Sequence, residues 1–91
     1  MPADVVVYTT TYCPYCTRAK MHLTKKGVPF KEIDVSDDPE KRRWLMETTK
    51  QRTVPQIFVN GKPIGGCDDM LALDRRGGLD PLLAEPPAKT G

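Results

Sequence analysis

The chain has 91 residues, 38% of them hydrophobic, which suits a single small domain over residues 1–84. Fourteen Lys and Arg against twelve Asp and Glu give a formal net charge of +2 that is spread along the sequence, too weak to indicate a nucleic-acid partner. No stretch approaches the roughly 20 apolar residues of a membrane span, and nothing at the amino terminus is typical of a signal peptide, so we expect a cytoplasmic protein.

The first third of the sequence predicts a strand followed by a helix. Residues 4–8 are rich in valine and flanked by polar residues, as in a short buried strand. Pro14 suits the first position of a helix, where its missing N–H is no loss, and Gly27 suits the end of one. Four residues recur at helical spacing, so one face of the helix is expected to carry Cys16 inward: Cys16, Ala19, Leu23 and Lys26.

A second strand and a second helix follow. Residues 28–35 are predicted to form the strand, with Pro29 near its start, where a missing donor is tolerated. The polar residues 36–38 offer an N-cap, and Pro39 opens the helix. The side chains expected on its inner face are Trp44, which we place in the core, Leu45 and Thr48.

The strongest hairpin signal is Asn60-Gly61, because these residues readily adopt the positive φ of a type I′ turn. Residues 56–59 and 62–64 are therefore predicted to be antiparallel strands. The earlier strand–helix–strand unit predicts a parallel pair with a right-handed crossover. Together they give a mixed four-stranded sheet with helices packed against it.

A third helix is expected to have Asp68 or Asp69 as its N-cap and to run to about Arg76. Residues 79–84 suit a final short helix. Residues 85–91 offer nothing apolar to dock, so we expect a mobile tail. The predicted order is β-α-β-α-β-β-α, an α/β fold.

Chemistry is concentrated at Cys13 and Cys16, which stand three residues apart around a predicted helix start and can close a small disulfide. The odd total of three cysteines favours thiol chemistry in a reducing compartment over a secreted disulfide framework. The helix start supplies N–H donors and about half a positive charge, which lower the pKa of a thiol below the free value of about 8.5. A lowered pKa speeds the attack by Cys13 little, since the larger thiolate population is offset by lower nucleophilicity. Its main benefit is that Cys13 becomes a better leaving group when a second thiol attacks the mixed disulfide.

A metal site is the competing interpretation of this cysteine pair. Zinc needs four ligands, yet the only further candidates are Cys67 and His22, so we expect no metal. We interpret His22, in the middle of the first predicted helix, as a partly exposed structural residue.

Three motifs in this order and spacing resemble the bacterial dithiol glutaredoxins of the glutaredoxin 3 type. They cover about residues 4–83 and are Cys13-Pro14-Tyr15-Cys16, Thr53-Val54-Pro55 and Gly65-Gly66-Cys67-Asp68-Asp69. The resemblance implies a thioredoxin-like fold and a glutathione-dependent thiol–disulfide oxidoreductase that reduces protein–glutathione mixed disulfides and protein disulfides. It thereby implies a role in cell redox homeostasis and electron transfer. We expect the protein to work as a monomer.

The same resemblance implies roles for individual residues. Cys13 is the nucleophile and Cys16 the resolving thiol. Arg42 suits the glycine carboxylate of glutathione, and an Asp carboxylate suits its ammonium group. Val54, before a cis Pro55, would pair with the extended tripeptide through its backbone. The full set implied for glutathione binding is Tyr15, Arg42, Thr53, Val54, Pro55, Gly66, Cys67, Asp68 and Asp69.

Two features qualify these roles. Cys67 is interpreted as a small packed residue beside the site instead of a third reactive thiol. Thr10 stands where many family members have a lysine, three residues before the nucleophile. Without this lysine, one contact to a glutathione carboxylate and one contribution to stabilising the Cys13 thiolate are in doubt. The helix start is left with more of that task.

Two other functions remain open at this stage. A thioredoxin-like protein reduced by a flavoprotein is disfavoured by Arg42 and Asp68-Asp69, which offer charge partners for a zwitterionic tripeptide. An iron–sulfur carrier would use Cys13 and glutathione from two protomers as cluster ligands. Pro14 argues against it, because in the resembling family this proline accompanies disulfide chemistry more than cluster binding.

Overall fold

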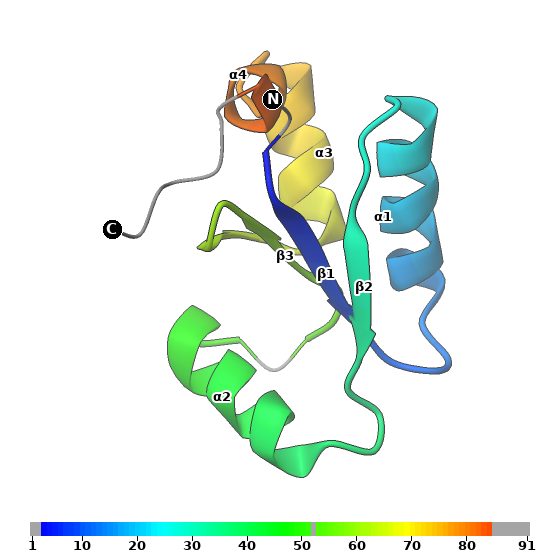
Figure 1. Ribbon diagram of the computed structural model, residues 1–91, viewed down its shortest axis with the longest axis vertical. Coiled ribbons are helices and arrows are strands. Elements are labelled where there is room, and N and C mark those ends of the chain that lie inside the picture. Colours follow the sequence, from blue (N-terminus) through cyan, green and yellow to red (C-terminus); the bar gives the residue numbers. More distant parts are fainter. Residues whose placement is uncertain (1–2, 52, 85–91) are drawn as a thin grey trace.

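The computed structural model describes residues 3–51 and 53–84, in which a central sheet is flanked by helices (Figure 1). The predicted mobile tail, residues 85–91, lies outside the described residues. The elements in chain order are β1 (Val5–Thr9), α1 (Pro14–Lys25), β2 (Lys31–Asp34), α2 (Pro39–Thr49), β3 (Gln56–Val59), β4 (Lys62–Gly65), α3 (Cys67–Arg75) and α4 (Leu79–Ala84). The predicted order is confirmed, with α4 as the final short helix.

The sheet has the strand order β2-β1-β3-β4. β1 pairs in parallel with β2, with Val7 opposite Glu32, and antiparallel with β3, with Val7 opposite Ile57. β3 and β4 form the predicted hairpin, and Asn60 and Gly61 have φ of 52° and 80°, as a type I′ turn requires. This is the mixed four-stranded sheet of a thioredoxin-like fold.

Alternation along the strands divides the core between the two faces of the sheet. Val5 and Val7 of β1 point to the face covered by α1, α3 and α4, where they join Leu23 and Met70 in the larger cluster. Tyr8 points to the other face and joins a smaller cluster that α2 covers through Leu45. Figure 1 shows α2 set apart from the other three helices, across the sheet.

The second strand is shorter than predicted. Residues 28–35 were expected to be extended, but β2 begins at Lys31. The cause is the end of α1: the Val28 N–H donates to the Leu23 carbonyl at 3.0 Å, so Val28 still closes the helix. Pro29 then has no N–H to offer to a neighbouring strand.

The prediction that Trp44 is a core residue is wrong, because its side chain is 40% exposed. It lies at the rim of the smaller cluster, where its ring stacks on Phe58 with 5.7 Å between centroids. Lys41 Nζ lies 4.8 Å from the centre of the Trp44 ring. Thr48 is also exposed, which leaves Leu45 as the buried residue of this helix. Of the helices in the described part of the chain, only α2 contributes to this cluster, and Trp44 at its rim stays partly open to solvent.

α1 and α3 are joined at the ends remote from the Cys13–Cys16 pair. His22 Nε2 lies 2.7 Å from Asp74 Oδ2, and Lys26 Nζ lies 3.1 Å from Asp74 Oδ1. Hydrogen bonds from these two side chains lower the pKa of the Asp74 carboxyl. His22 therefore has the partly exposed structural place that the sequence predicted. Within residues 3–51 and 53–84, no helix is long and apolar enough to cross a membrane.

Candidate active site

Cys13 is the N-cap residue of α1, and its own side chain provides the cap. The Cys16 N–H donates to Cys13 Sγ with 3.1 Å between nitrogen and sulfur. The two cysteines form a disulfide with 5.1 Å between their Cα atoms. Cys13 is partly exposed, whereas Cys16 is only 2% exposed. The first turn of α1 contains no acidic residue that would oppose an anion at this position.

The loop that precedes Cys13 is fixed by the loop after β2. The Thr11 N–H donates to Ser36 Oγ at 2.7 Å, and the two hydroxyl groups lie 2.9 Å apart. Thr10, the position that departs from the resembling family, lies in this same loop between β1 and α1.

The segment before β3 brings a backbone carbonyl up to the reactive sulfur. The Val54–Pro55 peptide bond is cis, as the resemblance implied. Cys13 Sγ lies 3.6 Å from the Val54 carbonyl oxygen, near enough for a reduced thiol to donate to it. Gln56 is almost fully buried, and its Nε2 donates to the Thr53 carbonyl at 2.7 Å. Gln56 thus fixes the backbone of the segment that contains the cis Val54–Pro55 bond.

The start of α3 completes the site, but its N-cap is neither of the predicted aspartates. Gly66 occupies that position, and its N–H donates to Asp69 Oδ2 at 3.0 Å. Gly65 has φ +104°, and a Cβ on it would collide with the Asp69 carboxylate, so glycine is required there. Because Asp69 is occupied in capping, Asp68 is the carboxylate that remains available in the first turn.

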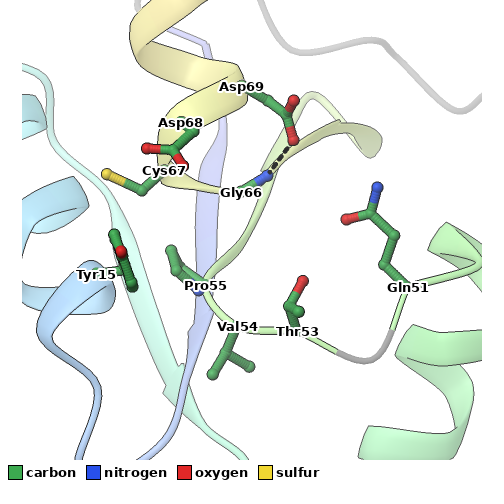
Figure 2. Close-up of a pocket in the computed structure, with 9 residues that line it drawn as sticks. All are labelled: Tyr15, Gln51, Thr53, Val54, Pro55, Gly66, Cys67, Asp68 and Asp69. Carbon is green, nitrogen blue, oxygen red and sulfur yellow. Dashed lines mark hydrogen bonds between the residues drawn. The ribbon is translucent and has the colours of Figure 1, made fainter.

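These three segments enclose an open groove of about 290 Å³. Figure 2 shows Tyr15 at one end, Pro55 in the middle and Gln51 at the opposite end, with the start of α3 above them. The lining residues are Tyr15, Gln51, Thr53, Val54, Pro55, Gly66, Cys67, Asp68 and Asp69. The fold therefore brings together eight of the nine residues predicted to bind glutathione, and the Cys13 sulfur adjoins them at Val54.

Arg42 and Gln51 are the two differences between the predicted and observed sets. Arg42 is exposed on α2 and lines a separate depression with Pro39, Arg43 and Met46. Gln51 lines the groove but was not singled out, although its place two residues before Thr53 could have indicated it. The same holds for Gln56, a polar residue at the head of an otherwise apolar strand.

Cys67 differs from Cys13 in its surroundings. It is 3% exposed and belongs to the larger core cluster while one side faces the groove. Burial raises the pKa of the Cys67 thiol, and the neighbouring Asp68 carboxylate raises it further. Among the described residues, Cys67 and His22 do not gather with the cysteine pair into a metal-binding cluster. Cys67 is thus held as a neutral thiol.

Comparison with known proteins gives consistent results. The family model described as glutaredoxin matches residues 5–64. The chain is 52% identical over 81 residues to glutaredoxin 3 of Escherichia coli K12, covering 89% of this chain and 98% of that protein. It is 51% identical over 80 residues to a glutaredoxin of Pseudomonas aeruginosa, covering 88% and 95%.

Solved structures agree in fold. The solution structure of a glutaredoxin from Brucella melitensis superposes with a TM-score of 0.81 at 49% identity, covering 90% of this chain and 89% of that one. The crystal structure of a buckwheat glutaredoxin–glutathione complex superposes with a TM-score of 0.82 at 37% identity, covering 89% and 76%.

Proposed function

This chain belongs to the glutaredoxin family of thiol–disulfide oxidoreductases with a Cys-x-x-Cys redox pair, and we propose that Cys13 is its nucleophile and glutathione its reductant. The observation that supports this most strongly is the place of the Cys13 sulfur. It caps α1, accepts the Cys16 N–H at 3.1 Å and adjoins a groove of tripeptide size. An N–H donor and the helix start both favour a sulfur anion there.

In the proposed monothiol reaction, the Cys13 thiolate attacks the glutathione sulfur of a protein–glutathione mixed disulfide. A new disulfide forms between Cys13 and glutathione, the old one breaks, and the protein thiolate leaves and takes up a proton. The thiolate of a second glutathione then attacks the glutathione sulfur held on Cys13. Glutathione disulfide is released with the Cys13 thiolate, whose stabilisation by the helix start makes it a good leaving group.

Cys16 adds the dithiol reaction. When Cys13 has attacked a protein disulfide, the Cys16 thiolate attacks Cys13 of the mixed disulfide and expels the second protein thiolate. The product is the Cys13–Cys16 disulfide, which two glutathione molecules then reduce. Cys16 is well placed for this step, because its Cα is 5.1 Å from that of Cys13.

For glutathione itself we propose an extended pose along the groove. The backbone N–H and C=O of Val54 pair with the tripeptide, and Tyr15 flanks it. The α-carboxylate of the γ-glutamyl residue accepts from the first N–H groups of α3, which lack partners within the helix. Asp68 pairs with the ammonium group of the same residue. Thr53, Pro55, Gly66, Cys67 and Asp69 supply the remaining wall and its support.

The test is spectrophotometric turnover of the mixed disulfide of glutathione and 2-mercaptoethanol, coupled to NADPH through glutathione reductase. Cys13→Ser should fall to background. Cys16→Ser should retain this activity but lose glutathione-driven reduction of insulin disulfides. Met21→Ala, an exposed position on α1, is the matched control and should behave as wild type. Activity of Cys13→Ser above background would overturn the proposed nucleophile.

Arg42 lies outside the groove lining, so its proposed pairing with the glycine carboxylate needs its own test. If the side chain reaches across to glutathione, Arg42→Ala should raise the KM for glutathione about fivefold to tenfold with little change in kcat. Its neighbour Arg43 lines the same depression, and Arg43→Ala is the matched control. Equal effects of both variants would reduce the role of Arg42 to general attraction of an anion.

The remaining parts of the proposal concern the domain, its oligomeric state and its cellular compartment. We propose residues 1–84 as one glutaredoxin domain that acts as a monomer in the cytoplasm, where glutathione keeps thiols reduced. Its protein partners are those with glutathionylated cysteines or reducible disulfides. Anaerobic reconstitution with iron and sulfide should leave no visible absorption band; a stable coloured dimer would favour the cluster-carrier alternative.

A further inference from the structure

Tyr12 is an aromatic residue that the proposed chemistry does not use. Its side chain is 96% exposed, more than that of any other large hydrophobic residue in the described chain. It does not line the groove, and no hydrogen bond or ring contact ties it to another described residue. By itself a single exposed aromatic would be unremarkable on a protein surface. Its position directly before Cys13 distinguishes it from other exposed side chains.

The peptide chain places Tyr12 about 3.8 Å from Cys13 between Cα atoms, whatever the ring conformation. Two tyrosines therefore bracket the reactive sulfur, and the structure separates their surroundings. Tyr15 lies in the groove and carries Arg18 5.6 Å from its ring centre. Tyr12 lies outside the groove, on the loop that Figure 1 shows curving away from the sheet between β1 and α1.

The backbone on both sides of Tyr12 is held in place. Thr11 is tied to Ser36 by two hydrogen bonds of 2.7 and 2.9 Å, and Cys13 is fixed as the cap of α1. The ring therefore projects from an ordered backbone and has only two side-chain torsions to lose on contact. Tyrosine in such a setting is typical of contact residues in protein interfaces, because it buries much area at low entropic cost.

We propose that Tyr12 is a specificity-determining residue that packs against an apolar side chain adjacent to the target cysteine of a polypeptide substrate. The inference rests on the proposed function, in which Cys13 exchanges with such a cysteine. Glutathione occupies the groove on the Tyr15 side, so the polypeptide is left with the surface outside the groove. Tyr12 offers it an apolar ring within one residue of the reacting sulfur and contributes nothing to the binding of glutathione.

Two synthetic nonapeptides test this proposal. They differ only in the residues on either side of a glutathionylated cysteine, which are leucine in one and glycine in the other. Wild type should have a kcat/KM about fivefold higher for the leucine peptide, the factor equivalent to about 1 kcal/mol at 25 °C. Tyr12→Ala should bring this ratio close to one, whereas Tyr12→Phe should keep it, since the ring makes the contact.

The mixed disulfide of glutathione and 2-mercaptoethanol, which has no polypeptide, separates this inference from the proposed function. Tyr12→Ala should turn it over within twofold of wild type, and Met21→Ala should retain both that rate and the leucine preference. Equal losses on all substrates, or a leucine preference that survives in Tyr12→Ala, would overturn the role of Tyr12. A wild type with no turnover of the small substrate would instead overturn the proposed function, and the inference with it.

Discussion

Cys13 and Cys67 both stand at the start of a helix, yet the structure gives their sulfurs opposite surroundings. Cys13 caps α1, is partly exposed, and has no acidic residue in the turn that follows it. Cys67 is the first residue of α3, is buried in the larger core, and is followed at once by Asp68 and Asp69. Burial and the Asp68 carboxylate raise the pKa of Cys67.

The comparison teaches that a helix start is not enough to activate a thiol. The helix dipole and the free N–H groups act over the first turn only, and their effect is of the order of 1 kcal/mol. Desolvation and a neighbouring carboxylate can outweigh it. The Asp68 carboxylate that raises the pKa of Cys67 is also the one proposed to pair with the ammonium group of glutathione. The start of α3 is therefore suited to binding the ligand, whereas the start of α1 is suited to the thiol reaction.

Alkylation of the reduced protein should show the largest difference. At pH 7 iodoacetamide should modify Cys13 at least about a hundredfold faster than Cys67, because one sulfur is a stabilised, accessible anion and the other a buried neutral thiol. Mass spectrometry of proteolytic peptides over time measures both rates. In guanidinium chloride the two rates should converge. Comparable rates in the folded protein would remove the basis of the comparison.

Asp68→Asn should have the next largest effect. Loss of its charge should raise the KM for glutathione about tenfold, with kcat little changed, since an ion pair with the substrate is lost while Cys13 is untouched. The same substitution should lower the pKa of Cys67 towards its ordinary value. Asp80→Asn, on α4 and exposed, is the matched control for losing one carboxylate. An unchanged KM would show that Asp68 does not pair with the ammonium group.

A carboxylate placed in the first turns of α1 should raise the pKa of Cys13, as Asp68 raises that of Cys67. Thr17 is exposed one turn after Cys13, and its hydroxyl lies 3.4 Å from the Cys13 carbonyl oxygen. Thr17→Asp should shift the pH midpoint of iodoacetamide reactivity upward by about half a unit, equivalent to about 0.7 kcal/mol. Thr17→Asn makes the same steric change without the charge and should leave the midpoint in place. Identical midpoints would mean that charge in this turn does not reach the sulfur.

The smallest effect is expected where α1 and α3 meet at their other ends. His22 and Lys26 lower the pKa of Asp74 on folding, so its ionised form stabilises the fold above the unfolded pKa of about 3.9. Asp74→Asn should reduce the free energy of unfolding by about 0.5 kcal/mol at pH 7. This deficit should shrink as the pH falls through the lowered pKa, where wild type also loses the charge. Urea unfolding at pH 7 and pH 3 measures it; a deficit that is constant with pH would point to packing instead.

Much of the fold was predictable because its signals are local. The Asn60-Gly61 turn specifies the hairpin by backbone preference alone, and Pro14 and Pro39 mark two helix starts. The predictions that were wrong concern residues whose structure depends on a hydrogen bond to another residue. Val28 was assigned to a strand, but it closes α1 instead. Asp69 was a candidate N-cap, but it reaches back to the Gly66 N–H from the third helical position.

The candidate site divides in the same way. Cys13, Cys16 and the motifs around Pro55 and Gly66 could be read from residue types and spacing. Gln51 was missed, although it lies two residues before Thr53, because its side chain becomes part of the groove only where the start of α3 lines the same groove. Trp44 was misplaced for a related reason: its burial depends on packing by segments distant in the chain, and among the described residues it stays 40% exposed at the rim of the smaller cluster.

The sequence by itself determined the order of strands and helices and the helix start at which Cys13 lies, because periodicity, prolines and turn residues act within a few positions. Only the tertiary structure decided that Cys13 stays accessible at this helix start, that the Val54 carbonyl lies beside the reactive sulfur, and that Tyr12 stays outside the groove. Those outcomes depend on contacts between distant segments, such as the Cys13–Val54 contact across 41 positions and the Thr11–Ser36 contact across 25, and on the solvent that their packing excludes or admits.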